Sequence, residues 1–186
     1  MKRPLATVAA RLGLVVGLVA ALAVGLAGCG IAARTVPIPT AEPTPLITPS
    51  TTLQVTRLQV ETALRGANLA VIVPQLPFRP GESPALAAAP RLVLQAVLAE
   101  DPTHGFIVVY DFPDAGTAWG AGNEMAQYIA SGPGRVQFPP DAEHVLRQVG
   151  STLVFFTWSP ANSSDPRAAD VVTALSSLGA GIPIRR

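Results

Sequence analysis

Two short groups of acidic and histidine residues are the first candidates for chemistry in this sequence. Asp101 and His104 flank a Pro-Thr pair, and Glu143 directly precedes His144. Carboxylates and imidazoles bind metals and transfer protons, and Asp111 would add a further ligand if the fold brought it near. Neighbouring residues of a strand point to opposite faces, so Glu143 and His144 are poorly placed to share one metal ion. We therefore expect structural or solvated roles for both histidines and no bound metal.

An acid–base or metal-assisted enzyme remains an alternative, provided that its candidate residues cluster in one pocket. Those candidates are Asp101, His104, Asp111, Asp114 and His144. The sequence lacks the residues that serine hydrolases and lysine-dependent enzymes require. It has no Gly-x-Ser-x-Gly motif, and its only lysine is Lys2. No later lysine can form a Schiff base or hold a phosphate. We expect no cofactor and favour a protein without catalytic activity.

Aromatic residues outside the regular patterns are candidates for a binding surface. The proline-rich segment 74–90 carries Phe78 and Arg79, and a segment of this length without predicted structure either covers the core or binds a partner. Trp119 lies away from the apolar stripe of its predicted helix, and Trp158 ends an apolar run. Exposed tryptophans would mark a partner or ligand surface, whereas buried ones would belong to the core.

The N-terminal region has the three parts of a secretory leader, and small residues precede a single cysteine. Its cationic residues are Lys2, Arg3 and Arg11, its apolar segment is 12–24, and the sequence Leu26, Ala27, Gly28, Cys29 follows. These four residues resemble the lipobox of bacterial lipoproteins at every position. The resemblance implies that Cys29 becomes the lipidated first residue of the mature chain, which is anchored to the cell membrane on its extracytoplasmic side.

An uncleaved membrane-spanning helix over residues 12–33 is the alternative to a lipoprotein leader, because that uncharged stretch is long enough to cross a bilayer. Both interpretations place the C-terminal domain outside the cytoplasm. Cys29 is the only cysteine, so lipidation would leave neither a disulfide nor a catalytic thiol.

Three segments follow from composition: a leader over residues 1–28, a lipidated tether rich in Pro and Thr over 29–52, and one domain over 53–186. Five prolines lie between residues 30 and 52, a composition that favours extended chain over a packed core. Beyond the leader, ten Arg residues face twelve Asp and Glu residues, a balance that argues against a nucleic-acid partner.

Three helices are predicted along the domain, separated by two groups of three strands. One helix begins after Asp114 as its N-cap and stops at Gly132, a second begins at Asp165 with Pro166 in its first turn and ends at Gly179, and a third spans 51–66. Strands are predicted from apolar and β-branched runs. These runs are 69–73, 92–98, 106–112, 135–138, 144–149 and 152–158.

Short links between successive strands favour antiparallel pairing. We therefore predict an α+β fold, a two-layer sandwich in which a mainly antiparallel sheet carries its helices on one face. From residue 106 onward, the element order partly matches a ferredoxin-like split βαβ unit. The leading functional hypothesis is a lipoprotein that binds an envelope protein or a small ligand, and a purely structural envelope component is a further alternative.

Overall fold

The computed structural model describes residues 50–185. The leader, Cys29 and almost all of the predicted tether lie outside the described residues. Ser50 caps the first described helix, because its Oγ accepts the backbone N–H of Leu53 at 3.0 Å. This helix begins at Thr51, so it includes the last two residues assigned to the tether.

The protein is an α+β domain built on a six-stranded sheet in which every neighbouring pair is antiparallel, as predicted. The strand order is β1-β2-β3-β5-β4-β6. The strands are β1 (Val71–Ile72), β2 (Arg91–Ala96), β3 (Phe106–Asp111), β4 (Glu143–Val149), β5 (Thr152–Trp158) and β6 (Ala180–Gly181). The helices described are α2 (Thr51–Gly66), α3 (Pro84–Ala88), α4 (Ala115–Ala130), α5 (Gly132–Gln137) and α6 (Ala168–Ser176).

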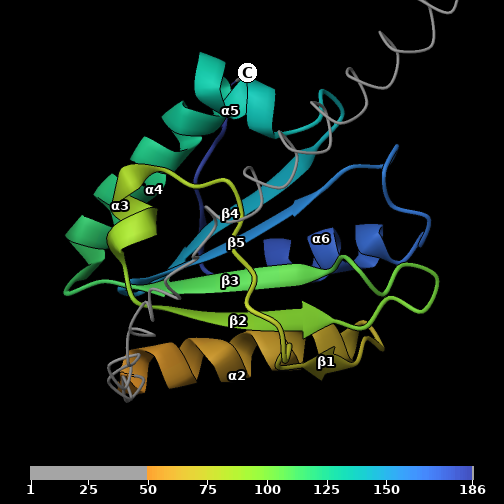
Figure 1. The fold of residues 1–186 in the computed structure, drawn as a ribbon. Coiled ribbons are helices and arrows are strands. Elements are labelled where there is room, and N and C mark those ends of the chain that lie inside the picture. Colours follow the sequence, from red (N-terminus) through yellow and green to blue (C-terminus); the bar gives the residue numbers. More distant parts are fainter. Residues whose placement is uncertain (1–49, 186) are drawn as a thin grey trace, which may run out of the picture. The chain divides into compact units, whose positions relative to one another are not determined.

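Helices cover both faces of the sheet, so the prediction of helices on one face is wrong. On β3, Ile107 packs into the core beneath α2 and α6, whereas Val108 packs into the core beneath α3 and α4. On β5, Phe156 and Phe155 divide between the two cores in the same way. Figure 1 shows the two groups of helices on either side of the strands. The result is three layers rather than two.

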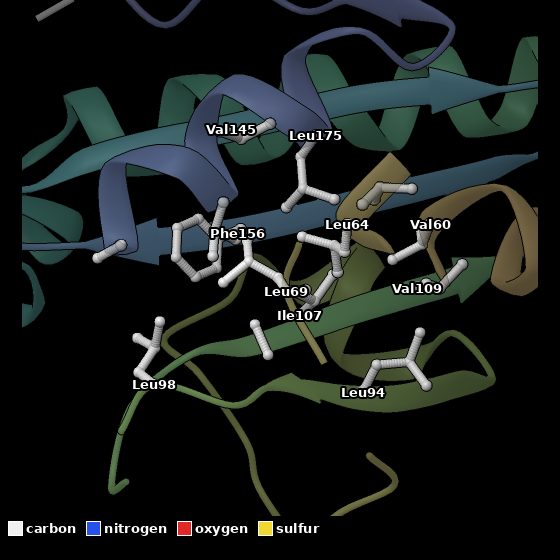
Figure 2. Close-up of a cluster of buried hydrophobic side chains, with 14 of the residues drawn as sticks. Val60, Leu64, Leu69, Leu94, Leu98, Ile107, Val109, Val145, Phe156 and Leu175 are labelled. Carbon is white, nitrogen blue, oxygen red and sulfur yellow. The ribbon is translucent and has the colours of Figure 1, made fainter. Parts of the chain in front are cut away.

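The core beneath α2 and α6 is formed by aliphatic side chains from both helices and from the strands between them. Val60 and Leu64 of α2 point into it, as does Leu175 of α6, and Ile107 and Val109 of β3 meet them from the sheet (Figure 2). Val55 and Leu58, which do not match the apolar stripe of α2, are 49% and 61% exposed. The spacing of buried residues on α2 is therefore that of a helix with one packed face.

The predicted split βαβ unit is present. β3 and β4 are both antiparallel to β5, which lies between them, so β3 and β4 are parallel and α4 connects them. The likeness to the ferredoxin-like order ends after β5, because α6 packs on the opposite face from α4 and β6 pairs with the outer edge of β4.

The predicted strand 135–138 is wrong, because these residues belong mainly to α5. Ser131 is extended and ends α4, and Pro133 then occupies the first turn of a new helix. A Cβ atom on Gly134 would lie 2.7 Å from Cα of Ile129, so only glycine lets α5 pack this closely on the end of α4. Val136, which suggested a strand, is 88% exposed.

Asp114 caps its helix as predicted, whereas Asp165 lies before the residue that caps its helix. Asp114 is the N-cap of α4, and its Oδ1 accepts the N–H of Thr117 at 2.7 Å. Asp165 accepts the N–H of Arg167 at 2.9 Å, but α6 itself begins at Ala168 and ends at Ser176 before Gly179. Among the helices of residues 50–185, none is both long and apolar enough to span a membrane.

Candidate functional site

A pocket of about 300 Å³ opens at the end of the sheet where β2 passes into β3 and where β5 ends. We call it the sheet-end pocket. The β2–β3 hairpin and the loop from β5 to α6 form two of its sides, and segments 78–81 and 137–142 form the others. Its side chains are mostly aromatic or neutral and polar, and no described residue lining it is an aspartate, a glutamate, a lysine or an arginine.

Four aromatic residues form the wall of the sheet-end pocket: Phe78, Phe138, Phe156 and Trp158. Phe78 stacks on Phe106 with ring centroids 4.1 Å apart, so the proline-rich segment is held against the start of β3. Phe138 and Phe156 are buried and belong to opposite cores. The pocket therefore lies where the two cores meet at the end of the sheet.

Trp158 lines the pocket with its ring but has a buried Nε1 that finds no hydrogen-bond partner in the described part of the chain. A buried donor without a partner costs about 1–3 kcal/mol. Phenylalanine would fill much of the same space without that cost. Packing alone thus gives no reason for tryptophan at this position.

Asp101 and His104 lie together at the rim of the pocket. His104 Nδ1 is 2.6 Å from Asp101 Oδ1, and Ser163 Oγ donates to Asp101 Oδ2 at 2.6 Å. The Asp101 side chain is only 7% exposed, whereas that of His104 is 53% exposed. Burial works to raise the pKa of Asp101, but the hydrogen bonds from Ser163 and His104 outweigh it and the pKa lies below its ordinary value.

The backbone around His104 is fixed by the adjacent glycine. Gly105 has a φ of 86°, and a Cβ atom there would lie 2.5 Å from the carbonyl oxygen of Ala96. Both constraints exclude a side chain at this turn. The hairpin therefore holds His104 at the rim through its local geometry as well as through Asp101.

Two carboxylates hold the loop that follows β5. Ser159 Oγ donates to both carboxylate oxygens of Asp141, at 2.9 and 2.8 Å, and Ser163 donates to Asp101. In a hydrolytic triad the serine hydroxyl bonds to the histidine, not to the carboxylate. Neither serine is therefore arranged as a nucleophile toward His104. Between them, Asn162 lines the pocket from an exposed position.

The other acidic and histidine candidates lie away from this pair. Asp111 is at the far end of β3, and Asp114 is occupied as the cap of α4. His144 stacks on Phe155 with ring centroids 6.2 Å apart and contacts Phe138 by its edge. Within residues 50–185, no group of three or more His, Cys, Asp and Glu side chains is placed to hold a metal ion.

Arg79 does not line the pocket but takes part in an ionic cluster around a buried carboxylate of the same proline-rich segment. Glu82, whose side chain is 4% exposed, accepts hydrogen bonds from Arg79 at 2.6 Å, from Arg91 at 2.6 and 2.8 Å and from the Tyr110 hydroxyl at 2.8 Å. Arg91 connects this cluster to β2, and Tyr110 connects it to β3. The cluster therefore attaches segment 79–82 to the sheet beside the pocket.

Of the four residues predicted to form a binding surface, Phe78 and Trp158 meet in the sheet-end pocket. Trp119 is 43% exposed on α4 and does not line it. Sequence reasoning missed Phe138, Asn162 and Phe156. Phe156 lies inside a strand pattern that predicts core packing, and the other two lie in segments whose placement depends on distant contacts.

No protein-family model, characterised protein or solved structure matches the chain.

Proposed function

We propose that this protein is an exported lipoprotein of the cell envelope whose domain binds a small, uncharged and largely apolar molecule in the sheet-end pocket. The observation that carries the proposal is the pocket itself, an aromatic wall edged by neutral polar groups. Small-molecule sites are typically concave and apolar, with a few polar groups that orient the ligand. The volume of about 300 Å³ matches the lower end of their range.

The absence of fixed charge among the lining residues described above narrows the class of ligand. A phosphate or a dianion would require arginine or lysine side chains or a set of backbone N–H groups directed at it. An apolar body gains roughly 25 cal/mol for each Å² that it removes from water. The pocket therefore favours compounds whose binding is driven by burial of apolar surface.

The Asp101–His104 pair favours a second function, in which His104 acts as a general base on a bound molecule. A carboxylate that orients an imidazole is found in acid–base sites. Ser159 and Ser163 are both bonded to carboxylates, so this alternative relies on water or on the ligand itself as the reacting group. Binding explains the aromatic wall and requires no such additional group, so we favour it.

Export and lipidation predict a specific mature N-terminus. We expect the chain purified from its own membranes to begin at Cys29 and to carry at least two acyl chains, because a single chain gives only marginal attachment. Intact-mass and N-terminal peptide mass spectrometry measure both features. An unmodified chain that retains residues 1–28 would contradict the lipoprotein assignment.

Ligand binding predicts a change in the fluorescence of Trp158. In the variant Trp119→Phe, Trp158 is the only tryptophan and it lines the pocket. Titration of the chain from residue 30 with 4-propylphenol, excited at a wavelength that selects tryptophan, is expected to change the emission of this variant saturably. In the matched variant Trp158→Phe, the exposed Trp119 should report no saturable change. Equal responses of the two variants would contradict binding in the pocket.

A further inference from the structure

Among the described residues that line the sheet-end pocket, one side chain is titratable. Whether that side chain donates or accepts decides which hydrogen bond a ligand must make with it. This inference rests on the proposed binding function. His104 is that side chain among the described lining residues. Apart from Trp158, whose indole nitrogen is itself buried, the remaining polar lining residues bear hydroxyl or carboxamide groups, each of which both donates and accepts. Ser159 and Ser163 already donate their hydroxyl hydrogens to Asp141 and Asp101, so toward a ligand they can only accept. The direction of hydrogen bonding at His104 is fixed by its surroundings in the same way.

Asp101 determines which ring nitrogen of His104 donates and which accepts. Its carboxylate is buried and ionised, so it only accepts hydrogen bonds. The ring nitrogen 2.6 Å away, Nδ1 of His104, must therefore carry a hydrogen and donate it. In the neutral imidazole the other nitrogen then has no hydrogen, so Nε2 is an acceptor.

Ligands that bring an acceptor or a negative charge are disfavoured by the same arrangement. An ether or ketone oxygen finds no hydrogen on Nε2 of the neutral ring. A ligand carboxylate would lie close to Asp101, and it would also meet the field of Asp165, which accepts the backbone N–H of Glu100 at 3.1 Å in the adjoining loops. Asp141 adds a further negative charge beyond Ser159. A ligand with a hydrogen-bond donor fits without these costs.

We propose that the sheet-end pocket takes an uncharged, ring-bearing molecule that carries one hydroxyl or N–H group, and that this group donates to Nε2 of His104. The ring lies against the aromatic wall, where Phe78, Phe138 and Trp158 offer faces and edges for stacking or edge-on contact. A phenol is the simplest member of this class of ligand. Asp101 is then a positioning residue, because it acts on the ligand only through the imidazole.

Three probes with the same propylbenzene body separate the possibilities: 4-propylphenol as donor, 4-propylanisole as acceptor and 4-propylbenzoate as anion. Calorimetric titration of the chain from residue 30, which contains all of residues 50–185, measures the three affinities near neutral pH. One hydrogen bond between neutral groups corresponds to about a tenfold difference in affinity. We therefore expect 4-propylphenol to bind about tenfold more tightly than 4-propylanisole, with 4-propylbenzoate the weakest.

Two variants test whether His104 causes the difference in affinity between 4-propylphenol and 4-propylanisole. His104→Phe keeps a ring but removes Nε2, so the ratio of the phenol and anisole affinities should fall to about one. His144→Phe makes the same change at the chain's other histidine, which does not line the sheet-end pocket, and should leave the ratio unchanged. A thermal melt of each variant confirms that it is folded. If His104→Phe does not fold, the ratio measured with the unsubstituted chain still decides whether the pocket prefers a ligand that donates.

The outcomes separate this inference from the proposed function. Equal affinities for the phenol and the anisole, or a preference for the benzoate, would overturn the donor inference and leave ligand binding in place. An unchanged ratio in folded His104→Phe would overturn the assignment to Nε2. Failure of all three probes to bind would contradict the proposed function itself.

Discussion

Replacing Glu82 with glutamine is expected to lower the free energy of unfolding by about 3 kcal/mol, because it leaves two arginines beside a buried site that has lost its negative charge. The Glu82 side chain is 4% exposed and that of Arg91 is 21% exposed, so neither can recover full hydration without moving. The Tyr110 hydroxyl would also lose its carboxylate acceptor. Urea unfolding of the chain from residue 30 measures the change.

The matched control is Glu61→Gln. Glu61 forms an ion pair with Arg57 one turn away on α2, at 2.7 Å, and both side chains are more exposed than Glu82. A helical pair of this kind contributes about 0.5 kcal/mol or less. An equal and small loss in both variants would show that the Glu82 cluster does not hold segment 79–82 to the sheet.

The same cluster predicts how stability depends on pH. Burial works to raise the pKa of Glu82, but hydrogen bonds from Arg91, Arg79 and Tyr110 outweigh it, so the pKa lies below its ordinary value of 4.5. A carboxyl whose pKa is lowered by folding stabilises the folded state above the unfolded-state pKa. That contribution is lost as the pH falls below about 4.5 and through the folded-state pKa. Glu82→Gln should therefore show a weaker loss of stability with acid than the unsubstituted chain.

Truncating Phe156 or its neighbour Phe155 is expected to cost about 3–5 kcal/mol in either case, because both rings are fully buried. Each is 1% exposed, but Phe156 packs beneath α2 and α6 and Phe155 beneath α3 and α4. Equal losses in Phe156→Ala and Phe155→Ala, measured by urea unfolding, would support a core on each face of the sheet. A loss near zero for either one would contradict that architecture.

The milder leucine variants separate stability from binding. Phe156 lines the sheet-end pocket and Phe155 does not. Phe156→Leu should therefore weaken the binding of 4-propylphenol, whereas Phe155→Leu should leave it unchanged at a comparable loss of stability. A weaker affinity in both variants would show that the effect comes from general loosening of the fold.

Local signals in the sequence predict most elements of this fold. Asp114 marks the start of α4 because its side chain satisfies a backbone N–H at the helix end, a contact that needs only neighbouring residues. The β-branched and aromatic run 152–158 coincides with β5. Such features depend on short stretches of chain, and a single sequence contains them in full.

Features that depend on distant contacts were predicted less well. Residues 106–110 are aliphatic or aromatic at successive positions, a pattern that requires cover on both faces of β3, whereas the predicted two-layer arrangement covers one face only. The segment 135–138 became helical because Pro133 starts a new helix and Gly134 packs on the end of α4, a contact that no strand pattern contains. Both errors concern packing between elements rather than local preference.

The candidate site was predicted in part for the same reason. Phe78 and Trp158 stand out in the sequence as aromatic residues outside regular patterns, and the fold brings them together in one pocket. The pairing of Asp101 with His104 follows from their spacing across a tight turn, but the contribution of Ser163 comes from 62 residues further along the chain. Glu82 gave no signal, because its partners on β2 and β3 are known only from the folded chain.

Blocking the sheet-end pocket tests ligand binding most directly. Asn162 lines the pocket from an exposed position, so Asn162→Trp would fill it from the rim, and Gln59→Trp places the same side chain on the exposed surface of α2. Calorimetric titration with 4-propylphenol should give no detectable binding to folded Asn162→Trp and unchanged binding to Gln59→Trp. Equal affinities of the two variants would contradict a ligand site in the sheet-end pocket.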